Sequence, residues 1–238
     1  MEPQLVVPGV YLLPFEIGQA YLWQWEDGLT VIDTGVTGSA PAILEAIGAL
    51  GRRPADVQEI VLTHFHHDHC GGAVQLVQAT GATVVAHQAD APVIRGERPG
   101  APPILTAAER PLAEAIFPRV PPAQPVRVDR AVDEGATTEG GGRLVSVPGH
   151  TPGSLALLLP RPSVLFTGDC IACAEGKPIL GPFNIDRSAA LASARKVAAL
   201  GCEVACFGHG PPLVGDASRQ LRTLTDPLGG DAPAQPES

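Results

Sequence analysis

Residues 64–69 have the sequence HFHHDH, which places four of the chain's seven histidines and one aspartate within six positions. Imidazole and carboxylate groups are the usual protein ligands of zinc, iron and manganese. Side chains of this kind are seldom buried without partners, because taking a polar group out of water costs free energy unless another group compensates it. The spacing therefore predicts a metal-binding loop, in preference to histidines that only face water.

The residues on either side of this loop indicate how it is held. The apolar run Glu59–Leu62 leads into it, and Gly71 and Gly72 separate it from Ala73–Val77. A short apolar run bounded by turn residues is typical of a buried strand, and the segment after the glycines has a helical pattern. We expect a strand, a ligand-bearing loop and then a helix.

Three further residues with metal-binding side chains stand at the ends of predicted strands. His150 lies in the glycine- and proline-rich turn 148–154, Asp169 follows the apolar run 163–166, and His209 comes just after the last predicted strand. Turns of this composition are rigid and hold a side chain still. Each of the three is therefore a candidate site residue.

The rest of the chain alternates between strand-like and helical stretches. Strands are predicted at 10–13, 20–25, 29–32, 59–62, 83–87, 127–132, 142–147, 155–159, 163–166 and 204–207. Helices are predicted at 42–47, after Gly72, and at 189–200 behind the cap Asp186. This order predicts an α/β protein built in layers, with mixed sheets.

The segment from Asp90 to Val128 has a different composition. Its nine prolines interrupt any long element, and one short helix is predicted from Pro111 to Phe117. Loops of this length in compact domains are commonly lids or binding segments. We expect a single domain over residues 1–224, a lid-like segment at 90–128, and a disordered tail at 225–238, which lacks an apolar pattern.

Charge and composition exclude several classes of partner. The formal net charge is −9 and there are only two lysines, so the clustered positive charge that nucleic acids require is missing. No apolar run approaches the roughly 18 residues that cross a membrane, and no secretory signal is recognised at the N-terminus. The five cysteines suit a reducing compartment, and we interpret them as buried thiols. A cytoplasmic protein with a small-molecule substrate is expected, and the proline-rich segment could pack against a second copy in a homodimer.

The ordered set HxHxDH, His150, Asp169 and His209 resembles the metallo-β-lactamase superfamily. Supporting matches are the segments Val31–Gly35, Pro148–Ser154, Thr167–Asp169 and Gly208–Gly210, and the resemblance extends from about Leu5 to Gly215. It implies a four-layer αββα sandwich of two mixed β-sheets flanked by helices.

The resemblance also implies a ligand set and a reaction. His64, His66 and His150 would hold one metal ion, Asp68, His69 and His209 a second, and Asp169 would bridge them. Two zinc ions per chain are expected, with iron or manganese as alternatives. A hydroxide bridging the metals would attack an ester, thioester or lactone-type carbonyl, with Asp68 as the proton shuttle.

Other reactions of the same fold stay open at this point. One alternative is a persulfide dioxygenase with a single iron, although this chain keeps both His69 and His209. Another is β-lactam hydrolysis, although true β-lactamases of the superfamily typically have cysteine or serine in place of Asp169. A third is a binding module that keeps only the fold.

Three polar residues near the candidate ligands are given other roles. His67 is predicted to point away from its neighbours, and His87 is interpreted as a histidine with a local hydrogen bond. Asp33 follows the strand 29–32 in a turn typical of the family, and the resemblance implies that it supports the ligand loop by hydrogen bonding.

Overall fold

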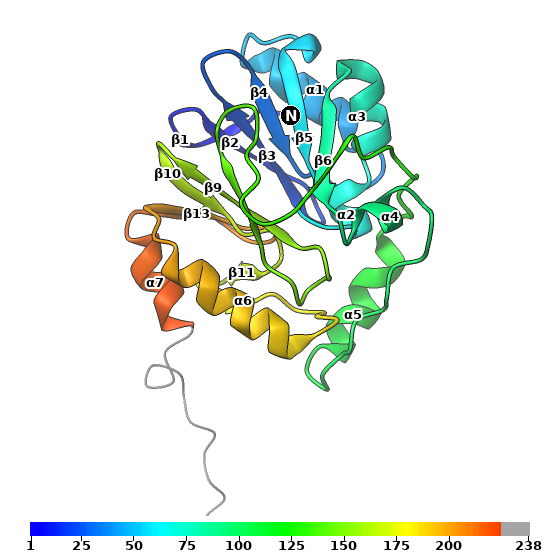
Figure 1. The fold of residues 1–238 in the computed structure, drawn as a ribbon, viewed down its shortest axis with the longest axis vertical. Coiled ribbons are helices and arrows are strands. Elements are labelled where there is room, and N and C mark those ends of the chain that lie inside the picture. Colours follow the sequence, from blue (N-terminus) through cyan, green and yellow to red (C-terminus); the bar gives the residue numbers. More distant parts are fainter. Residues whose placement is uncertain (225–238) are drawn as a thin grey trace, which may run out of the picture.

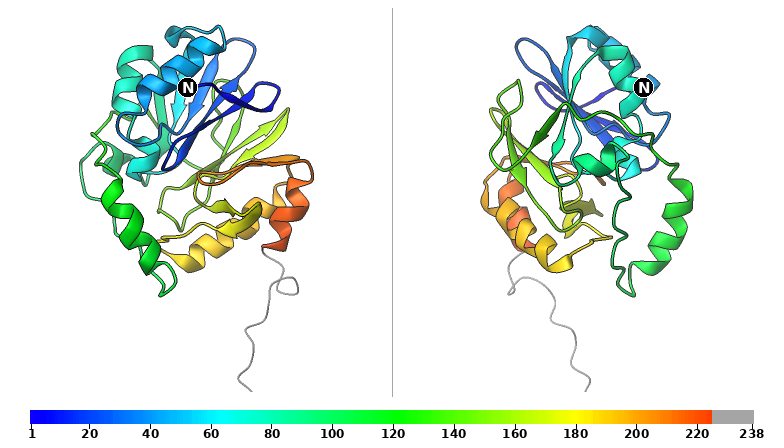
Figure 2. Two further views of the ribbon diagram at one scale, coloured as in Figure 1. Left: turned by 180° about the vertical axis from the view of Figure 1, so that it is seen from behind. Right: turned by 45° about the vertical axis from the view of Figure 1, so that its right-hand side comes forward.

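The computed structural model describes residues 1–224. Two β-sheets face each other, and helices cover their outer faces, so the molecule has four layers (Figures 1 and 2). This is the αββα arrangement that the family resemblance implies. The tail prediction for 225–238 lies outside the described residues.

The larger sheet contains seven strands that follow one another in chain order. They are β1 (Gln4–Val7), β2 (Val10–Pro14), β3 (Gln19–Gln24), β4 (Leu29–Ile32), β5 (Val57–Val61), β6 (Thr83–His87) and β7 (Arg130–Val132). The first four pair antiparallel, and β4 to β7 pair parallel. Parallel pairs need long crossovers, and these contain the helices α1 (Ala40–Ala49), η1 (Pro54–Asp56), α2 (His67–Cys70) and α3 (Ala73–Thr80).

The second sheet has the strand order β14-β13-β10-β9-β8. Its strands are β8 (Arg143–Ser146), β9 (Leu155–Pro160), β10 (Ser163–Phe166), β13 (Val204–Cys206) and β14 (Leu213–Val214). The parallel pair is β10 with β13, joined through a crossover that contains α6 (Arg187–Ala199). Helix α7 (Ala217–Thr223) packs beside α6.

Successive side chains of a strand point to opposite faces of the sheet, and this divides the buried core into three clusters. In β5, Ile60 belongs to the cluster that the larger sheet forms with α1 and α3, whereas Val61 belongs to the cluster between the two sheets. In β10, Val164 and Phe166 face the space between the sheets, and Leu165 packs with α6 and α7. Strands buried on both faces read as continuous apolar runs, which is why the sequence revealed most of them.

Some boundaries differ from the sequence expectation. The strand predicted at 127–132 begins only at Arg130, because the Asp129 carboxylate accepts the Val84 N–H at 2.9 Å in place of a backbone partner. The elements β1, β14 and α7 were not predicted. A hairpin of β11 (Ile171–Ala174) and β12 (Lys177–Leu180), which follows Asp169, was not predicted either.

The proline-rich segment 90–128 contains only short helices. They are α4 (Ala91–Ile94), α5 (Arg110–Ile116) and the 3-10 turn η2 (Phe117–Arg119). The bounds of α5 are close to those of the helix predicted at 111–117. Figure 1 shows the segment passing along one side of the molecule, near the end of α6. Within residues 1–224, no helix has the length and apolar character needed to cross a membrane.

Candidate metal centre

The candidate ligands lie at one edge of the sandwich, where strands of both sheets end. His64 follows β5, while Asp169 and His209 follow the parallel strands β10 and β13. The turn between β8 and β9 supplies His150 from the second sheet. Carboxyl ends of parallel strands meet at the same edge of a sheet, so the fold itself brings these distant residues together.

His64, His66 and His150 form the first group of possible ligands. His66 Nδ1 lies 3.1 Å from His64 Nε2 and 2.9 Å from His150 Nε2. Four ligands at about 2.0–2.1 Å from a tetrahedral zinc are separated by roughly 3.3 Å. The spacing of these nitrogens is therefore close to that of ligands around one metal ion.

The partners of the other ring nitrogens fix the direction of the lone pairs. The Thr63 hydroxyl donates to Asp33 at 2.7 Å, so it can only accept the hydrogen bond from His64 Nδ1, at 3.0 Å. His150 Nδ1 donates to the Pro182 carbonyl oxygen at 3.0 Å. Both histidines therefore keep an unprotonated Nε2 that faces the other members of the group.

Asp68, His69 and His209 form the second group. The carboxylate of Asp68 lies 3.3 Å from His209 Nε2 and 3.7 Å from His69 Nε2. His69 is fully buried, whereas Asp68 and His209 are partly exposed. Helix α2 places Asp68 and His69 one after the other, directly behind the loop that carries the first group.

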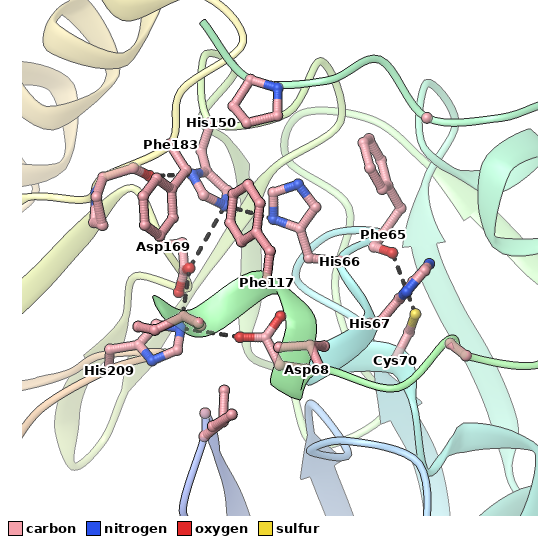
Figure 3. Close-up of a pocket in the computed structure, with 18 of the residues that line it drawn as sticks. Phe65, His66, His67, Asp68, Cys70, Phe117, His150, Asp169, Phe183 and His209 are labelled. Carbon is pink, nitrogen blue, oxygen red and sulfur yellow. Dashed lines mark hydrogen bonds and ion pairs between the residues drawn. The ribbon is translucent and has the colours of Figure 1, made fainter. Parts of the chain in front are cut away.

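Asp169 lies between the two groups. One carboxylate oxygen is 3.5 Å from His150 Nε2 and 3.3 Å from His209 Nε2, and the other is 3.4 Å from His69 Nε2 (Figure 3). A carboxylate in this position can contact an ion in either group. It is where a bridging ligand would have to be.

Two buried polar atoms of this cluster have no hydrogen-bond partner among the described residues. They are His69 Nε2 and Asp169 Oδ1. Buried polar atoms normally have a hydrogen-bond partner, so a buried polar atom without one calls for an explanation such as a bound ion. The donor set, its spacing and these unmet atoms all fit a metal ion, so the residues present are able to hold one.

The electrostatic state of the first group suits metal binding. Burial lowers the pKa of His64, His66 and His150, that of His66 to about 3. The three rings are therefore neutral near neutral pH. Neutral imidazole is the form that ligates a metal.

The second group behaves as a set of ion pairs. Burial tends to raise the pKa of Asp68 and Asp169, but the neighbouring histidines outweigh it and hold both pKa values below their usual range. Burial tends to lower the pKa of His209, but Asp169 and Asp68 outweigh it and raise the pKa to about 10. Without a metal the histidines of this group hold protons, which a bound cation would replace.

Asp33 has the supporting position that the sequence predicts. It accepts the Thr63 N–H at 2.7 Å, the Thr63 hydroxyl at 2.7 Å and His69 Nδ1 at 2.8 Å. This buried carboxylate therefore orients a histidine of the second group and, through Thr63, His64 of the first.

Asp90 has a comparable position, which sequence analysis missed. Its carboxylate accepts the backbone N–H of Phe65 at 3.2 Å, the Thr151 hydroxyl at 2.6 Å and the Gly153 N–H at 2.7 Å. It thereby joins the HFHHDH loop to the turn that contains His150. The signal in the sequence was an aspartate three residues after a strand-ending histidine, at the start of the proline-rich segment.

Gln19 and Tyr21 hold the His209 turn, and sequence analysis missed these residues as well. Gln19 Nε2 donates to the carbonyl oxygens of Phe207 and Gly210 at 2.7 and 2.8 Å, and the Tyr21 hydroxyl donates to the Phe207 oxygen at 2.8 Å. Both belong to β3 of the opposite sheet. These bonds fix the distance between the sheets at the site.

The remaining histidines and the cysteines have the predicted positions. His67 is exposed and extends away from the cluster in Figure 3. His87 Nδ1 accepts the Ala89 N–H at 3.1 Å. All five cysteines are buried free thiols, and burial raises the pKa of Cys170 to about 12.

A cavity of about 820 Å³ opens over the cluster. Its floor includes His66, Asp68, His150, Asp169 and His209. Its walls come from the proline-rich segment, the β11–β12 hairpin and the loop after β12. The candidate metal centre therefore lies at the bottom of a space large enough for an organic substrate.

Comparisons with known proteins agree with this arrangement. The sequence model of the metallo-beta-lactamase superfamily matches residues 13–209. A probable metallo-hydrolase of Bacillus subtilis, YflN, is 27% identical and is matched over 87% of this chain and 86% of its own length. A hydroxyacylglutathione hydrolase of Cereibacter sphaeroides is 36% identical over 68% of this chain, but the match spans only 51% of that relative.

Solved structures give the same result. A subclass B3 metallo-beta-lactamase of Bradyrhizobium japonicum superposes with a TM-score of 0.65 at 27% identity, over 87% of this chain and 77% of that one. The family match covers most of the described chain and includes all the candidate ligands. The chain therefore belongs to the metallo-beta-lactamase superfamily.

Proposed function

We propose that the chain is a metal-dependent hydrolase that cleaves an ester, thioester or lactone-type carbonyl substrate with two zinc ions. The observation that supports this most directly is the position of Asp169. It lies within 3.5 Å of histidines from both ligand groups, at the floor of an open cavity. Two groups that share one carboxylate are the arrangement that a two-metal site requires.

The number of protein ligands favours catalysis over a structural role. Each group offers three side chains besides the shared carboxylate, and His66, Asp68 and His209 are only partly buried, on the cavity side. Structural zinc sites are closed, whereas catalytic sites keep a position open for water or substrate. When bound, metal ions here would polarise a substrate carbonyl and lower the pKa of water.

Asp68 is the residue proposed to move the proton. Burial tends to raise the pKa of Asp68, but its neighbours His69 and His209 outweigh burial and hold the pKa low, so the carboxylate is ionised. It also lines the cavity, where the attacking water and the leaving group would both have to be. Asp68 would therefore take a proton from the attacking water and pass it to the leaving group.

The named relatives support a hydrolase and leave its substrate as part of the proposal. Several relatives are named hydroxyacylglutathione hydrolases, and the match spans about half to three fifths of the length of three of them. The structural neighbours include metallo-beta-lactamases. Thioesters and β-lactams therefore belong in the substrate panel beside simple esters and lactones.

Metal analysis combined with a substrate panel tests the proposal. The purified chain should hold two zinc ions and hydrolyse at least one ester, thioester or lactone, and a chelator should abolish this activity. One iron per chain with oxygen uptake on glutathione persulfide would instead identify a dioxygenase. Absence of bound metal under zinc-saturating conditions would rule out both reactions.

A variant at the shared carboxylate makes the test specific. Asp169→Ala should lose the second metal ion and most hydrolysis while its circular dichroism spectrum stays that of a folded protein. Glu26→Ala, at an exposed carboxylate away from the cavity, is the matched control and should keep both. Unchanged turnover in Asp169→Ala would refute the role of this residue.

A further inference from the structure

The walls of the cavity differ in character from its floor. The floor is made of the histidines and carboxylates of the metal centre, whereas most residues above it are apolar. Ligand cavities commonly combine a few placed polar groups with an apolar lining that decides which molecules fit. The walls are therefore where the substrate's non-reacting part would be recognised.

One wall belongs to the proline-rich segment. Val93 and Ile94 of α4, Leu112 and Ile116 of α5, and Phe117 of η2 all line the cavity. Leu112 and Ile116 are four residues apart in one helix, so their side chains lie on the same face. The short helices between the prolines thus present an apolar face to the metal centre.

The opposite wall comes from the β11–β12 hairpin and the loop that follows it. Ile179 and Phe183 line the cavity from this side. The rings of Phe117 and Phe183 meet edge to face, with their centroids 5.0 Å apart, and both line the cavity that contains the ligand cluster (Figure 3). This aromatic pair joins the two walls next to the reacting centre.

Several of these apolar side chains are not covered by the protein itself. Leu112, Phe117 and Ile179 are 44%, 45% and 39% exposed, although most large apolar side chains of the chain are buried. Contiguous exposed apolar surface marks a place where another apolar group binds. A ligand that covers this surface would remove it from water, and burial of apolar surface is favourable for binding.

The charged side chains of the lining have partners of their own. Arg119 donates to the Glu16 carboxylate, and Arg98 donates to the Ala89 carbonyl oxygen at 3.0 Å. The Glu16 carboxylate offsets the charge of Arg119, whereas the neutral carbonyl oxygen leaves the charge of Arg98 in place. Because most of the lining is apolar and one of its two arginines is paired with a carboxylate, the walls favour a neutral apolar group over the charged peptide part of a glutathione thioester.

We propose that the substrate carries an uncharged, apolar acyl group of medium length, such as octanoyl, packed against Phe117 and Ile179. This inference rests on the proposed hydrolase function and narrows it to apolar acyl esters and thioesters. The acyl carbon would lie at the metal centre, and the chain would extend between the two walls.

A series of p-nitrophenyl esters tests the proposal, because only the acyl chain changes while the leaving group stays constant. Full burial of one methylene is worth roughly a fourfold change in an equilibrium or rate constant. The six extra methylenes of octanoate over acetate, partly buried in an open cavity, should raise kcat/KM of the zinc-loaded protein on the order of 100-fold.

Two wall variants and one control make the test residue-specific. Phe117→Ala and Ile179→Asp should each lower the octanoate-to-acetate ratio of kcat/KM by about tenfold, by removing apolar contact or by adding a charge. Ile179 lies on a partly exposed hairpin, so the second variant tests the wall even if the first fails to fold. Leu191→Ala, at a similarly exposed leucine on α6 outside the cavity, should leave the ratio unchanged.

Failure of the inference can be told apart from failure of the hydrolase function. Hydrolysis of all esters with no preference for chain length would overturn the apolar acyl proposal and leave the hydrolase intact. If no ester is hydrolysed, calorimetric binding of octanoate and acetate to the zinc-loaded protein decides instead. Octanoate binding at least tenfold tighter, and weakened by Ile179→Asp, supports the acyl site, and equal affinities overturn it.

Discussion

Asp33 Oδ2 accepts a hydrogen bond from His69 Nδ1 at 2.8 Å, and both residues are buried. The same carboxylate binds both the backbone and the hydroxyl of Thr63, the residue just before His64. Asp33 adopts a left-handed backbone conformation with φ of 58°, which is unfavourable for most residues but tolerated by aspartate and asparagine. One strained residue thus orients histidines that belong to both ligand groups.

Replacing this carboxylate should weaken metal binding without breaking the fold. In Asp33→Asn the backbone conformation is tolerated, but the amide offers one acceptor oxygen to three donors. Loss of a hydrogen-bond partner behind a ligating histidine typically lowers metal affinity 10–100-fold. We expect a decrease of that size in zinc affinity, measured by competition with a chromophoric chelator.

Asp216→Asn is the matched control for this change. Asp216 has nearly the same left-handed conformation, with φ of 54°, but lies exposed before α7, away from the cavity. The zinc affinity of the Asp216→Asn variant should equal that of the unmodified protein. If Asp33→Asn also binds zinc normally, the hydrogen bond to His69 has no part in holding the metal.

Gly208 leaves the space that the metal centre needs. A Cβ atom at this position would lie 2.0 Å from Asp169 Oδ1 and 2.7 Å from His69 Cε1. Gly208→Ala must therefore displace the shared carboxylate or the His209 turn. We expect loss of at least one zinc ion per chain and a large loss of activity, measured by metal analysis and turnover on the best substrate.

Gly48→Ala shows what the same substitution does where space is available. Gly48 lies in α1, and a Cβ there meets no atom within 4 Å. Alanine is favoured over glycine in a helix interior by up to about 1 kcal/mol, so this variant should be slightly more stable and fully metallated. Full zinc content in Gly208→Ala would show that the turn can shift without cost to the centre.

The sequence predicted the fold and the candidate ligands because both leave local signals. Buried strands such as β5 and β10 are continuous apolar runs, and the ligands stand directly behind strand ends in glycine-rich turns. The hairpin β11–β12 left no such signal, because its first strand is made of small residues with the sequence IACA. That omission matters, since Ile179 of this hairpin forms part of the cavity wall.

Contacts across long chain separations could not be predicted in the same way. Asp90 bonds to residues 25 and 63 positions away, and Gln19 to residues 188 and 191 positions away. A single aspartate or glutamine has no local pattern that names its partner. Asp33 was predicted only through the family resemblance, which places an aspartate after that strand.

Asp90 should affect the first ligand group more than the second. It bonds to Phe65, between His64 and His66, and to Thr151 and Gly153, next to His150. Asp90→Asn puts an amide N–H next to at least one of these donors, and an unsatisfied buried group costs about 1–3 kcal/mol. Urea unfolding should show a loss of that size, and stepwise zinc titration should show weaker binding mainly at one of the two sites.

An equal loss of affinity at both zinc sites would contradict this account of Asp90. Asp133→Asn is a suitable control, because Asp133 is an exposed carboxylate beside His87 on the same side of the larger sheet. Its removal should leave both zinc affinities and the free energy of unfolding nearly unchanged.

Glu59 makes the stability of the folded protein depend on pH, and it does so independently of the candidate metal ligands. It is fully buried in β5, where burial raises its pKa although the Glu139 N–H and Arg130 oppose this. A carboxyl whose pKa is raised by folding keeps its proton up to a higher pH in the folded state than in the unfolded state. The folded protein is therefore stabilised at low pH by this group, and that contribution is lost as the pH rises from about the unfolded value of 4.5 through the folded pKa.

Glu59→Gln removes this titration, because glutamine stays neutral. The unfolding free energy of the unmodified protein, minus that of Glu59→Gln, should fall as the pH rises from 4 to 7, measured by urea unfolding of the metal-free proteins. Glu203→Gln, at an exposed carboxylate beside the second sheet, should leave the difference flat. Stability curves of Glu59→Gln and the unmodified protein that run parallel over this range would show that Glu59 titrates as it does in the unfolded chain.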